Sequence, residues 1–396
     1  MRTILFVLCI PQLFYAQTKY LNQVKYWDYR HTFKSDFIEI GSQNGQSIPI
    51  AYRSLEDSIR EDTPLSSADL GWYLANLSTE YYIASKRMYL PVSEHEPSDN
   101  VQVLIELSKA LNVIDRLDLQ AEKMFGCELE QLNGFIANER RIGSTLDTSL
   151  HVKVRGMYAS ADQYINLIFG LSLTYQFLPE GTIVKGVDLK AQAKEQSLRL
   201  IGFLSENKWK IQLPCGTNKD DIYGVRNLRP YAPMLKDVAK TFTNKGDLKL
   251  NFLLRTSRSL SNLFRKSGKA LNDDGELAML LSVTRRERAV KRIEKLTGEN
   301  RWIIYPMIYA LVNQSQTNSR LDSLINQGEL LLNSTPVGGI YSSNGLRQAH
   351  GWSTASYFKN SELARLSETN STEKVKFNGL DFLLLYNIWF IHRTGI

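Results

Sequence analysis

The sequence predicts a mainly all-α protein: an α/α toroid or barrel of helical hairpins, with a short N-terminal mixed segment and minor loop strands. Apolar residues recur at helical spacing through most of the chain after residue 64. Two of these segments are similar to each other without a gap, and the last one shares their apolar character. Such internal repetition is typical of stacked helical hairpins.

The chain opens with a segment typical of a secretory signal peptide. An apolar run extends from Ile4 to Ile10, and the small residue Ala16 closes the segment. The run is far shorter than the roughly 20 residues that span a bilayer, and Pro11 interrupts it. We therefore expect residues 1–16 to be removed, the protein to be secreted or periplasmic, and no transmembrane segment to follow the leader.

The mature chain divides into two parts by pattern. Residues 17–64 are mixed and predict an N-terminal extended segment with one short hairpin, whose turn runs from Gly41 to Gly45. Residues 65–396 predict one α/α-toroid domain. Its expected helices run from about Ser67 to Met88, Asn100 to Phe125, Ala161 to Phe177, Asp188 to Ser205, Ala232 to Thr243, Leu248 to Arg265, Gly275 to Leu296, Arg301 to Val312, Ser319 to Leu332 and Gly379 to His392.

The repeat is clearest between the first and third of these helices. Placing Ser66 on Ser160 also places Ser78 on Ser172 and Tyr81 on Tyr175. Each copy is apolar on more than one side, which predicts an inner helix, and each precedes a more polar helix. The polar helix after the first copy has one apolar stripe, which consists of Val101, Leu104, Leu107, Leu111 and Ile114. A two-layer solenoid with open ends is the alternative.

Composition and charge narrow the possible partners. With 43% hydrophobic and 22% charged residues the chain is an ordinary folded protein, and its formal net charge of +7 is spread along the sequence. The densest basic stretch, from Arg285 to Lys295, includes the pair Glu287 and Lys291 and predicts a solvated helix face. A surface for acidic polysaccharide, anionic lipid or nucleic acid is its alternative. Because no aromatics interleave, no nucleic acid is expected.

No metal site or cofactor is expected, because CxxC, HExxH and clustered Cys/His spacings are absent from the sequence. Asp115, Asp118 and Glu122 share one helix face and predict an exposed acidic stripe paired with nearby Arg116 or Lys123, with cation binding as the alternative. Of the cysteines left after the leader, Cys127 and Cys215 are either bridged or two buried thiols.

Five segments carry a resemblance to other proteins: GWYLANLSTEYY, VIDRLDLQAE, LNGFIANE, ASADQYINLIFGLSLTYQF and FNGLDFLLLYN. They resemble a loose group of secreted bacterial helical proteins with no established activity. The general layout is similar to six-hairpin glycosidases and related polysaccharide-active α/α barrels. The resemblance implies the fold, and it transfers no catalytic pair to this chain.

Three carboxylates are candidate catalytic groups. Asp69, Asp162 and Asp381 fall in the first turns of predicted inner helices, so they are expected to face one opening, where two carboxylates could serve glycoside hydrolysis. The alternative is capping, because a carboxylate in a first turn interacts favourably with the helix dipole. Gln163, beside Asp162, is a candidate for substrate binding.

Two loops supply further candidates. The loop GGIYSSNGLRQAHGWSTASYF holds His350, a candidate catalytic residue, and Trp352, an aromatic platform for a sugar ring. The loop NKWKIQLPCGTNKDDIYGVRNLRPY holds Trp209, Tyr223 and Arg226, which could line the same opening. The alternatives are loops that simply fold onto the body.

The best functional hypothesis is therefore a secreted or periplasmic carbohydrate-active protein, either a glycoside hydrolase or polysaccharide lyase-like, with a glycan or polysaccharide as partner. The alternative is a non-catalytic scaffold that binds a glycan or a protein. Neither the substrate nor the oligomeric state follows from the sequence, and whether the protein is an enzyme stays open.

Overall fold

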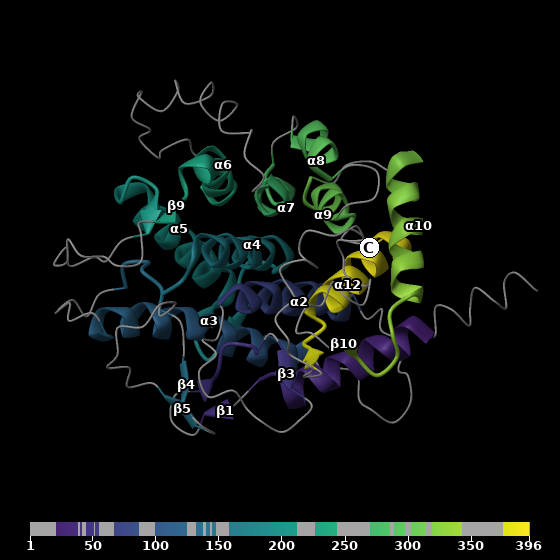
Figure 1. Ribbon diagram of the computed structural model, residues 1–396, viewed down its shortest axis with the longest axis horizontal. Helices are drawn as coiled ribbons and strands as arrows, with labels where there is room; N and C mark the ends of the chain where they lie inside the picture. The colour runs from purple at the N-terminus through teal and green to yellow at the C-terminus, as the bar shows by residue number, and fades with distance from the viewer. Residues whose placement is uncertain are drawn as a thin grey trace, which may run out of the picture.

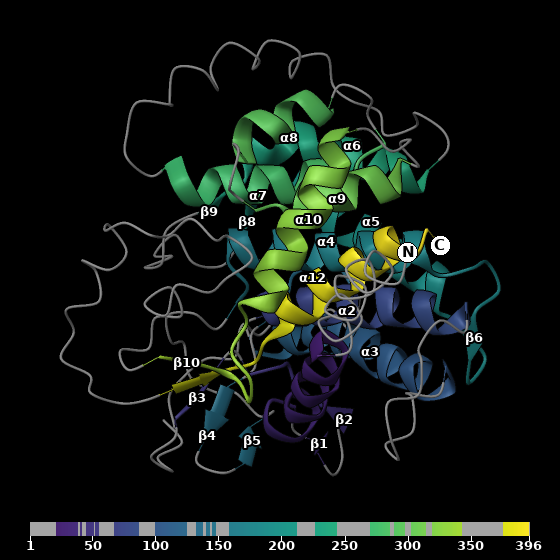
Figure 2. The same cartoon turned by 90° about the vertical axis from the view of Figure 1, so that its right-hand side faces the viewer.

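The protein is mainly helical, as predicted (Figure 1). The computed structural model describes residues 21–38, 40–41, 45–50, 52–54, 67–86, 100–124, 132–137, 140–142, 145–147, 158–211, 226–243, 270–285, 289–297, 302–313, 319–342 and 375–395. Figures 1 and 2 both place α7, α8 and α9 on one side of α4, with α3 and the N-terminal helix on the other side.

Eight described helices begin and end within three residues of their predicted ranges: α2, α3, α4, α5, α6, α9, α10 and α12. The N-terminal helix covers residues 21–36. The others are α2 (Ser67–Ser85), α3 (Asn100–Met124), α4 (Ala161–Phe177), α5 (Leu189–Glu206), the 3-10 turn η1 (Arg229–Tyr231), α6 (Ala232–Phe242), α7 (Ala270–Ser282), α8 (Ala289–Thr297), α9 (Ile304–Val312), α10 (Ser319–Asn333) and α12 (Leu380–Thr394). The helix predicted from Leu248 to Arg265 lies outside the described residues.

The strands are short and antiparallel, as expected of minor loop strands. The two-stranded ribbons are β1 (Ile40–Gly41) with β2 (Gly45–Gln46), β4 (Arg140–Ile142) with β5 (Thr145–Asp147), β6 (Ile183–Val184) with β7 (Val187–Asp188), and β8 (Lys210–Ile211) with β9 (Arg226–Asn227). One three-stranded sheet places β11 (Val375–Phe377) between β10 (Ile340–Ser342) and β3 (Tyr52–Ser54), so that Phe377 is opposite both Ile340 and Tyr52.

The expectation of an extended N-terminal segment is wrong for residues 21–36, which are helical. Tyr26, Tyr29, Phe33 and Phe37 recur every three or four residues and are all buried, so they form one apolar face. Tyr26 stacks on Tyr386 of α12, with ring centroids 4.6 Å apart. The predicted hairpin at Gly41–Gly45 is present as β1 and β2.

A single predicted helix from Gly275 to Leu296 is also wrong, because the chain forms two helices there, α7 and α8. After α7, the amide and the hydroxyl of Thr284 both bond back to the carbonyl of Leu281, at 3.2 and 2.9 Å. Side chains that bond locally to the backbone favour helix ends. The exposed Lys291 and Arg292 follow on α8 and fit the predicted solvated face.

Three helices are enclosed on all sides, as their apolar character predicts. Every residue of α4 from Gln163 to Thr174 is buried, and so is every residue of α12 from Leu380 to Ile391. In α2 the buried run extends from Tyr73 to Glu80. Such helices belong to the interior of a helical protein.

These three helices run in the same direction. Between α2 and α4, Trp72 bonds to Asn166 near the N-termini and Tyr82 packs on Phe177 near the C-termini. Between α2 and α12, Asn378 bonds to Asp69 at the start, and Asn387 bonds to Thr79 at 3.1 Å further along. The three N-termini therefore lie at one end of the protein.

The contacts between helices form a continuous series. α2 contacts α4, α4 contacts α7, α7 contacts α9, α9 contacts α12, and α12 contacts α2. The remaining helices lie outside this series: α3 contacts α2 and α5, α5 contacts α4 and α6, α8 contacts α7 and α9, and α10 contacts α9 and α12.

Candidate active site at the helix N-termini

The parallel course of α2, α4 and α12 brings Asp69, Asp162 and Asp381 to the same end of the protein, in the first turn of each helix. We call this end the mouth, and define it by these three carboxylates with Trp72 and Tyr305. The sequence predicted these carboxylates in first turns, and the structure places α2 in contact with both α4 and α12.

Asp69 is tied to the segment that starts α12. The side-chain nitrogen Nδ2 of Asn378 donates to Asp69 Oδ1 at 2.7 Å and to the backbone carbonyl of Ile50 at 3.1 Å. The side-chain oxygen Oδ1 of Asn378 accepts a hydrogen bond from the backbone amide of Leu380 at 3.1 Å. The Asn378 side chain therefore accepts the first amide of α12 while it holds Asp69 in place.

Gly379 precedes α12 in a left-handed conformation, with φ of 69°. A Cβ at this position would lie 2.5 Å from the ring of Tyr29 on the N-terminal helix. Both the backbone angle and the lack of space require glycine. Asp381, two residues on, is buried, and its Oδ1 accepts the amide of Phe382 at 2.8 Å.

Asp162 and Gln163 have different surroundings at the start of α4. Asp162 is exposed and accepts a hydrogen bond from the hydroxyl of Ser160. Gln163 is buried, and its side-chain oxygen accepts the amide of Ser160 at 2.7 Å, which is the capping-box bond that its position predicts. Of these two candidates, Asp162 is the one that faces solvent.

Trp72 supplies an aromatic surface beside these carboxylates. Its Nε1 donates to Asn166 Oδ1 at 2.7 Å, and its ring lies 5.7 Å from that of Phe169. The indole is only partly buried, one turn after Asp69. The sequence does not point to Trp72 as a site residue, because an aromatic residue at helical spacing is more often part of the core.

A tyrosine and a glutamate from the other side of the protein complete the mouth. Burial raises the pKa of the Tyr305 hydroxyl on α9 well above its usual range, and the nearby carboxylates of Glu276 and Asp381 raise it further. The hydroxyl of Tyr231 donates to Glu276 on α7. Tyr231, Glu276 and Tyr305 lie on η1, α7 and α9, and no sequence spacing links these elements. Only the tertiary structure shows that these side chains are neighbours.

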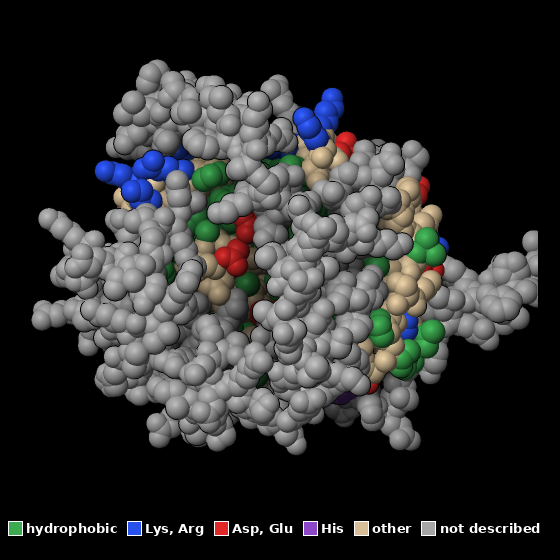
Figure 3. All heavy atoms as spheres, in the orientation of Figure 1, with side chains coloured by type: hydrophobic (Ala, Val, Ile, Leu, Met, Phe, Trp, Pro, Cys, Tyr) green, Lys and Arg blue, Asp and Glu red, His purple; other side chains and the backbone are tan. Residues whose placement is uncertain are grey.

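Figure 3 shows the same face in space-filling form. Over α4 the described surface is hollowed, acidic side chains gather in the hollow, and Lys and Arg side chains lie further out. In this view the described side chains of the hollow are mainly acidic and hydrophobic.

The second predicted loop approaches the same end. Trp209 follows the C-terminus of α5, which lies near the start of α4, since Phe203 of α5 stacks with Tyr164 of α4. Trp209 is buried with φ of 64°, and Lys236 lies 5.3 Å above its ring. Its carbonyl accepts the amide of Leu228, so Trp209 anchors the backbone that leads to Tyr231. The side chains of His350, Trp352, Tyr223 and Arg226 lie outside the described residues, and so do Cys127 and Cys215.

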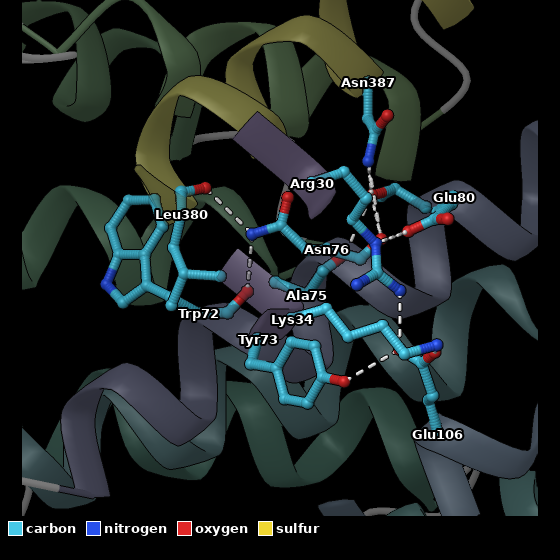
Figure 4. A network of polar contacts seen from close by, with 11 residues as sticks. Arg30, Lys34, Trp72, Tyr73, Ala75, Asn76, Glu80, Glu106, Leu380 and Asn387 are labelled. Carbon is cyan, nitrogen blue, oxygen red and sulfur yellow. Dashed lines mark hydrogen bonds and ion pairs between the residues drawn. The ribbon is translucent and has the colours of Figure 1, made fainter. Parts of the chain in front are cut away.

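Away from the mouth, a buried ion cluster joins the N-terminal helix to α2 and α3 (Figure 4). Arg30 donates to Glu80 at 2.8 Å and to Glu106 at 2.6 Å, and Lys34 and Tyr73 also bond to Glu106, at 2.6 and 3.0 Å. We call these five residues the Arg30 cluster. Burial alone would raise the pKa of Glu106, but Arg30 and Lys34 lower it to about 2.

A second ion cluster corrects the expectation for the acidic stripe of α3. Asp118 is fully buried rather than exposed, and it pairs with Arg199 of α5 at 2.9 Å. Asp115 pairs with the same guanidinium. Asp118 also accepts the amide of Gly134 at 2.9 Å, so this stripe holds a loop against α3 and α5. Among the described residues, no group of His, Cys, Asp and Glu could hold a metal ion.

Comparison with known proteins finds no family model, no curated protein and no solved structure that matches this chain. Within the part of the chain that the structure describes, no helix is both long and apolar enough to cross a membrane.

Proposed function

We propose that the protein is an α/α toroid whose inner ring consists of α2, α4, α7, α9 and α12. The series of contacts that leaves α2 and returns to it through α12 supports a closed ring rather than an open solenoid. The parallel course of α2, α4 and α12 and their burial on all sides fit inner helices.

We propose further that the mouth of this ring binds and hydrolyses a glycan. The observation that carries this proposal is the convergence of Asp69, Asp162 and Asp381 at one end of three parallel helices, beside the half-buried Trp72. An aromatic face packs on the C–H groups of a sugar ring, while carboxylates bond to its hydroxyls.

The chemistry needs two carboxyl groups in different roles. One, as the acid, protonates the oxygen of the leaving sugar, and the other activates water or attacks the anomeric carbon. The exposed Asp162 suits contact with water or substrate. The buried Asp381 of α12 lies close to Tyr305 of α9 and is the candidate for the second role.

The loop that holds His350 and Trp352 is proposed to reach the same mouth. Its chain leaves the described structure after β10 and returns at β11, and these strands pair with each other. Asn378, the residue that bonds to Asp69, follows β11 directly. Both ends of the loop are thus anchored beside the start of α12.

The alternative proposal is a non-catalytic scaffold that binds a glycan or a protein at this mouth. It is favoured by the positions of Asp69 and Asp381 in first turns, where a carboxylate stabilises its own helix. Under either proposal the leader of residues 1–16 directs the protein to the periplasm or the exterior.

The test is an assay of the protein on a panel of neutral and acidic polysaccharides. Hydrolysis releases reducing ends, whereas a lyase produces unsaturated uronates that absorb in the ultraviolet. We expect Asp162→Asn to lower the release of reducing ends at least about a hundredfold with an unchanged melting temperature. Asp322→Asn, in the first turn of the outer helix α10, is the matched control and should keep full activity.

Three results separate the proposals. Reducing ends that disappear in Asp162→Asn but not in Asp322→Asn support the hydrolase. Glycan binding without turnover, weakened by Trp72→Ala, supports the scaffold. A protein that neither binds nor degrades any glycan in the panel contradicts both.

A further inference from the structure

Basic side chains gather around Trp209, between the end of α5 and the start of α6. The described chain there, residues 205–211 and 228–243, carries five basic and two acidic side chains. In Figure 3 a group of Lys and Arg side chains lies beside the hollow, at the place where Figure 1 labels β9. We call four of the basic residues the basic rim: Lys208, Arg229, Lys236 and Lys240.

Hydrogen bonds join the basic rim to the mouth. The carbonyl of Trp209 accepts the amide of Leu228 at 2.7 Å. Arg229 Nε donates to the carbonyl of Lys208 at 3.3 Å. Tyr231, which bonds to α7 at the mouth, comes two residues after Arg229, so the Cα atoms of these two residues are at most ~7 Å apart. A polymer bound in the mouth can therefore reach the rim.

Lys208 occupies a position that favours glycine. It directly follows Asn207, the C-cap of α5, and its φ is 55°. A left-handed residue after a helix is usually glycine, because a Cβ is strained there. The Lys208 side chain is exposed, so packing in the interior does not explain a lysine. Its charge can interact favourably with the C-terminus of α5, so the test below measures stability and binding separately.

Two further amines lie next to each other on α6. Lys236 and Lys240 are four residues apart, a spacing at which like charges repel. Lys236 lies 5.3 Å above the ring of Trp209, and its pKa is lowered by burial and by the charge of Lys240. Asp237 pairs with Lys240 at 3.3 Å, and the described chain around the rim still carries more basic than acidic side chains. An anion bound between the amines would relieve their repulsion.

We propose that the basic rim binds the carboxylate or sulfate groups of an acidic polysaccharide whose chain enters the mouth. This inference rests on the proposed function and names its class of glycan, a polymer of uronic acids or sulfated sugars. The acidic mouth alone would repel such a polymer, and the rim supplies the opposite charge beside it. Nucleic acid is disfavoured, because Trp209 is only 4% exposed and offers no face for base stacking.

The experiment is titration calorimetry of the full protein with polygalacturonate, which carries carboxylates, with dextran sulfate, and with neutral dextran. We expect at least one polyanion to bind about tenfold or more tightly than dextran, and added salt to weaken this binding. The polyanion that binds more tightly identifies the anionic group that the rim prefers.

Variants of the rim show whether the amines act at their own positions. Lys208→Gly should weaken polyanion binding about fivefold, as expected for one partly exposed ion pair. Its melting temperature should stay the same or rise, because glycine relieves the left-handed backbone. Lys236→Gln with Lys240→Gln should weaken binding about tenfold or more. Where the protein degrades the polymer, these variants should raise KM and leave kcat unchanged.

Lys185→Gly is the matched control. Lys185 is exposed and left-handed, with φ of 49°, in the turn between β6 and β7. This turn follows the C-terminus of α4, whose N-terminus lies at the mouth. The variant removes the same charge and the same backbone strain as Lys208→Gly, but far from the rim, and it should bind like the unchanged protein.

The proposal is overturned if Lys185→Gly weakens binding as much as Lys208→Gly, since the polymer then responds only to net charge. It is also overturned if dextran binds as tightly as the polyanions, if a single-stranded oligonucleotide binds more tightly than either, or if Lys208→Gly lowers the melting temperature without changing the affinity.

The hydrolase and the rim can fail separately. Binding that depends on the rim, together with turnover that Asp162→Asn leaves unchanged, refutes hydrolysis at the mouth and supports the rim. Turnover of a neutral glycan that Asp162→Asn abolishes and Lys208→Gly leaves unchanged supports the hydrolase and overturns the rim.

Discussion

Gly71 of α2 and Gly170 of α4 lie against each other at the crossing of the two helices. A Cβ built on Gly170 would lie 2.1 Å from the carbonyl oxygen of Gly71, and a Cβ on Gly71 would lie 2.0 Å from the carbonyl oxygen of Asn166. Only glycine allows two backbones to approach so closely. This contact sets the distance between α2 and α4, and thereby the distance between the start of each helix at the mouth.

We predict that Gly71→Ala and Gly170→Ala each destabilise the protein by about 3 kcal/mol or more, because the added methyl group meets backbone atoms that cannot rotate away. Urea unfolding measures the change. Gly202→Ala in α5 is the matched control, since no atom lies within 4 Å of a Cβ there, and it should stabilise the protein by about 1 kcal/mol through helix propensity. Equal effects at all three positions would contradict the close contact.

The Arg30 cluster leads to a second prediction. Arg30→Met should destabilise the protein by about 3–5 kcal/mol, because it removes the buried guanidinium that bonds to both Glu80 and Glu106. Lys34→Met removes a side chain that is 57% exposed, so it should cost less than about 1 kcal/mol. Chemical denaturation at neutral pH compares the two. A small loss for Arg30→Met would mean that the N-terminal helix is held by apolar contacts alone.

Stability should fall in acid because of Glu106. Its pKa is about 2 in the folded protein, below its ordinary value of 4.5. The charged form is thus favoured by folding, so its contribution is complete above pH 4.5 and is lost as the pH falls from 4.5 to 2. The lost stability is about 3 kcal/mol. Unfolding free energies measured across this range should show the loss, and Glu106→Gln should flatten it. An equal acid response in that variant would assign the loss to other carboxylates.

For the mouth, we predict that Trp352→Ala weakens glycan binding about tenfold, since an aromatic platform contributes roughly 1 kcal/mol or more to a sugar complex. Titration calorimetry with a bound oligosaccharide measures the affinity. Trp209→Ala should instead lower the melting temperature, because the Trp209 side chain is buried and its loss leaves a cavity. Unfolding of both variants would make Trp352 a structural residue.

Much of the local structure follows from local patterns. The bounds of α4 coincide with the predicted range from Ala161 to Phe177, where a capping box starts the helix. The all-round apolar character of α2, α4 and α12 correctly indicated burial on every side. The N-terminal helix was missed because its aromatic period was interpreted as a mixed segment, although Tyr26, Tyr29 and Phe33 share one face.

For the candidate site, the sequence predicts the position of each residue in its helix but not its tertiary partners. The sequence by itself determined that Asp69, Asp162 and Asp381 stand in first turns, because caps and apolar periods mark where a helix begins. It could not determine their partners: Asn378 bonds to Asp69 from far along the chain, Arg199 reaches Asp118, and Tyr305 lies near Glu276 and Asp381. A local sequence pattern indicates whether a residue is buried or caps a helix. Which side chains meet depends on how helices cross, and that is decided by close contacts such as Gly71 with Gly170, where packing leaves room for only one arrangement.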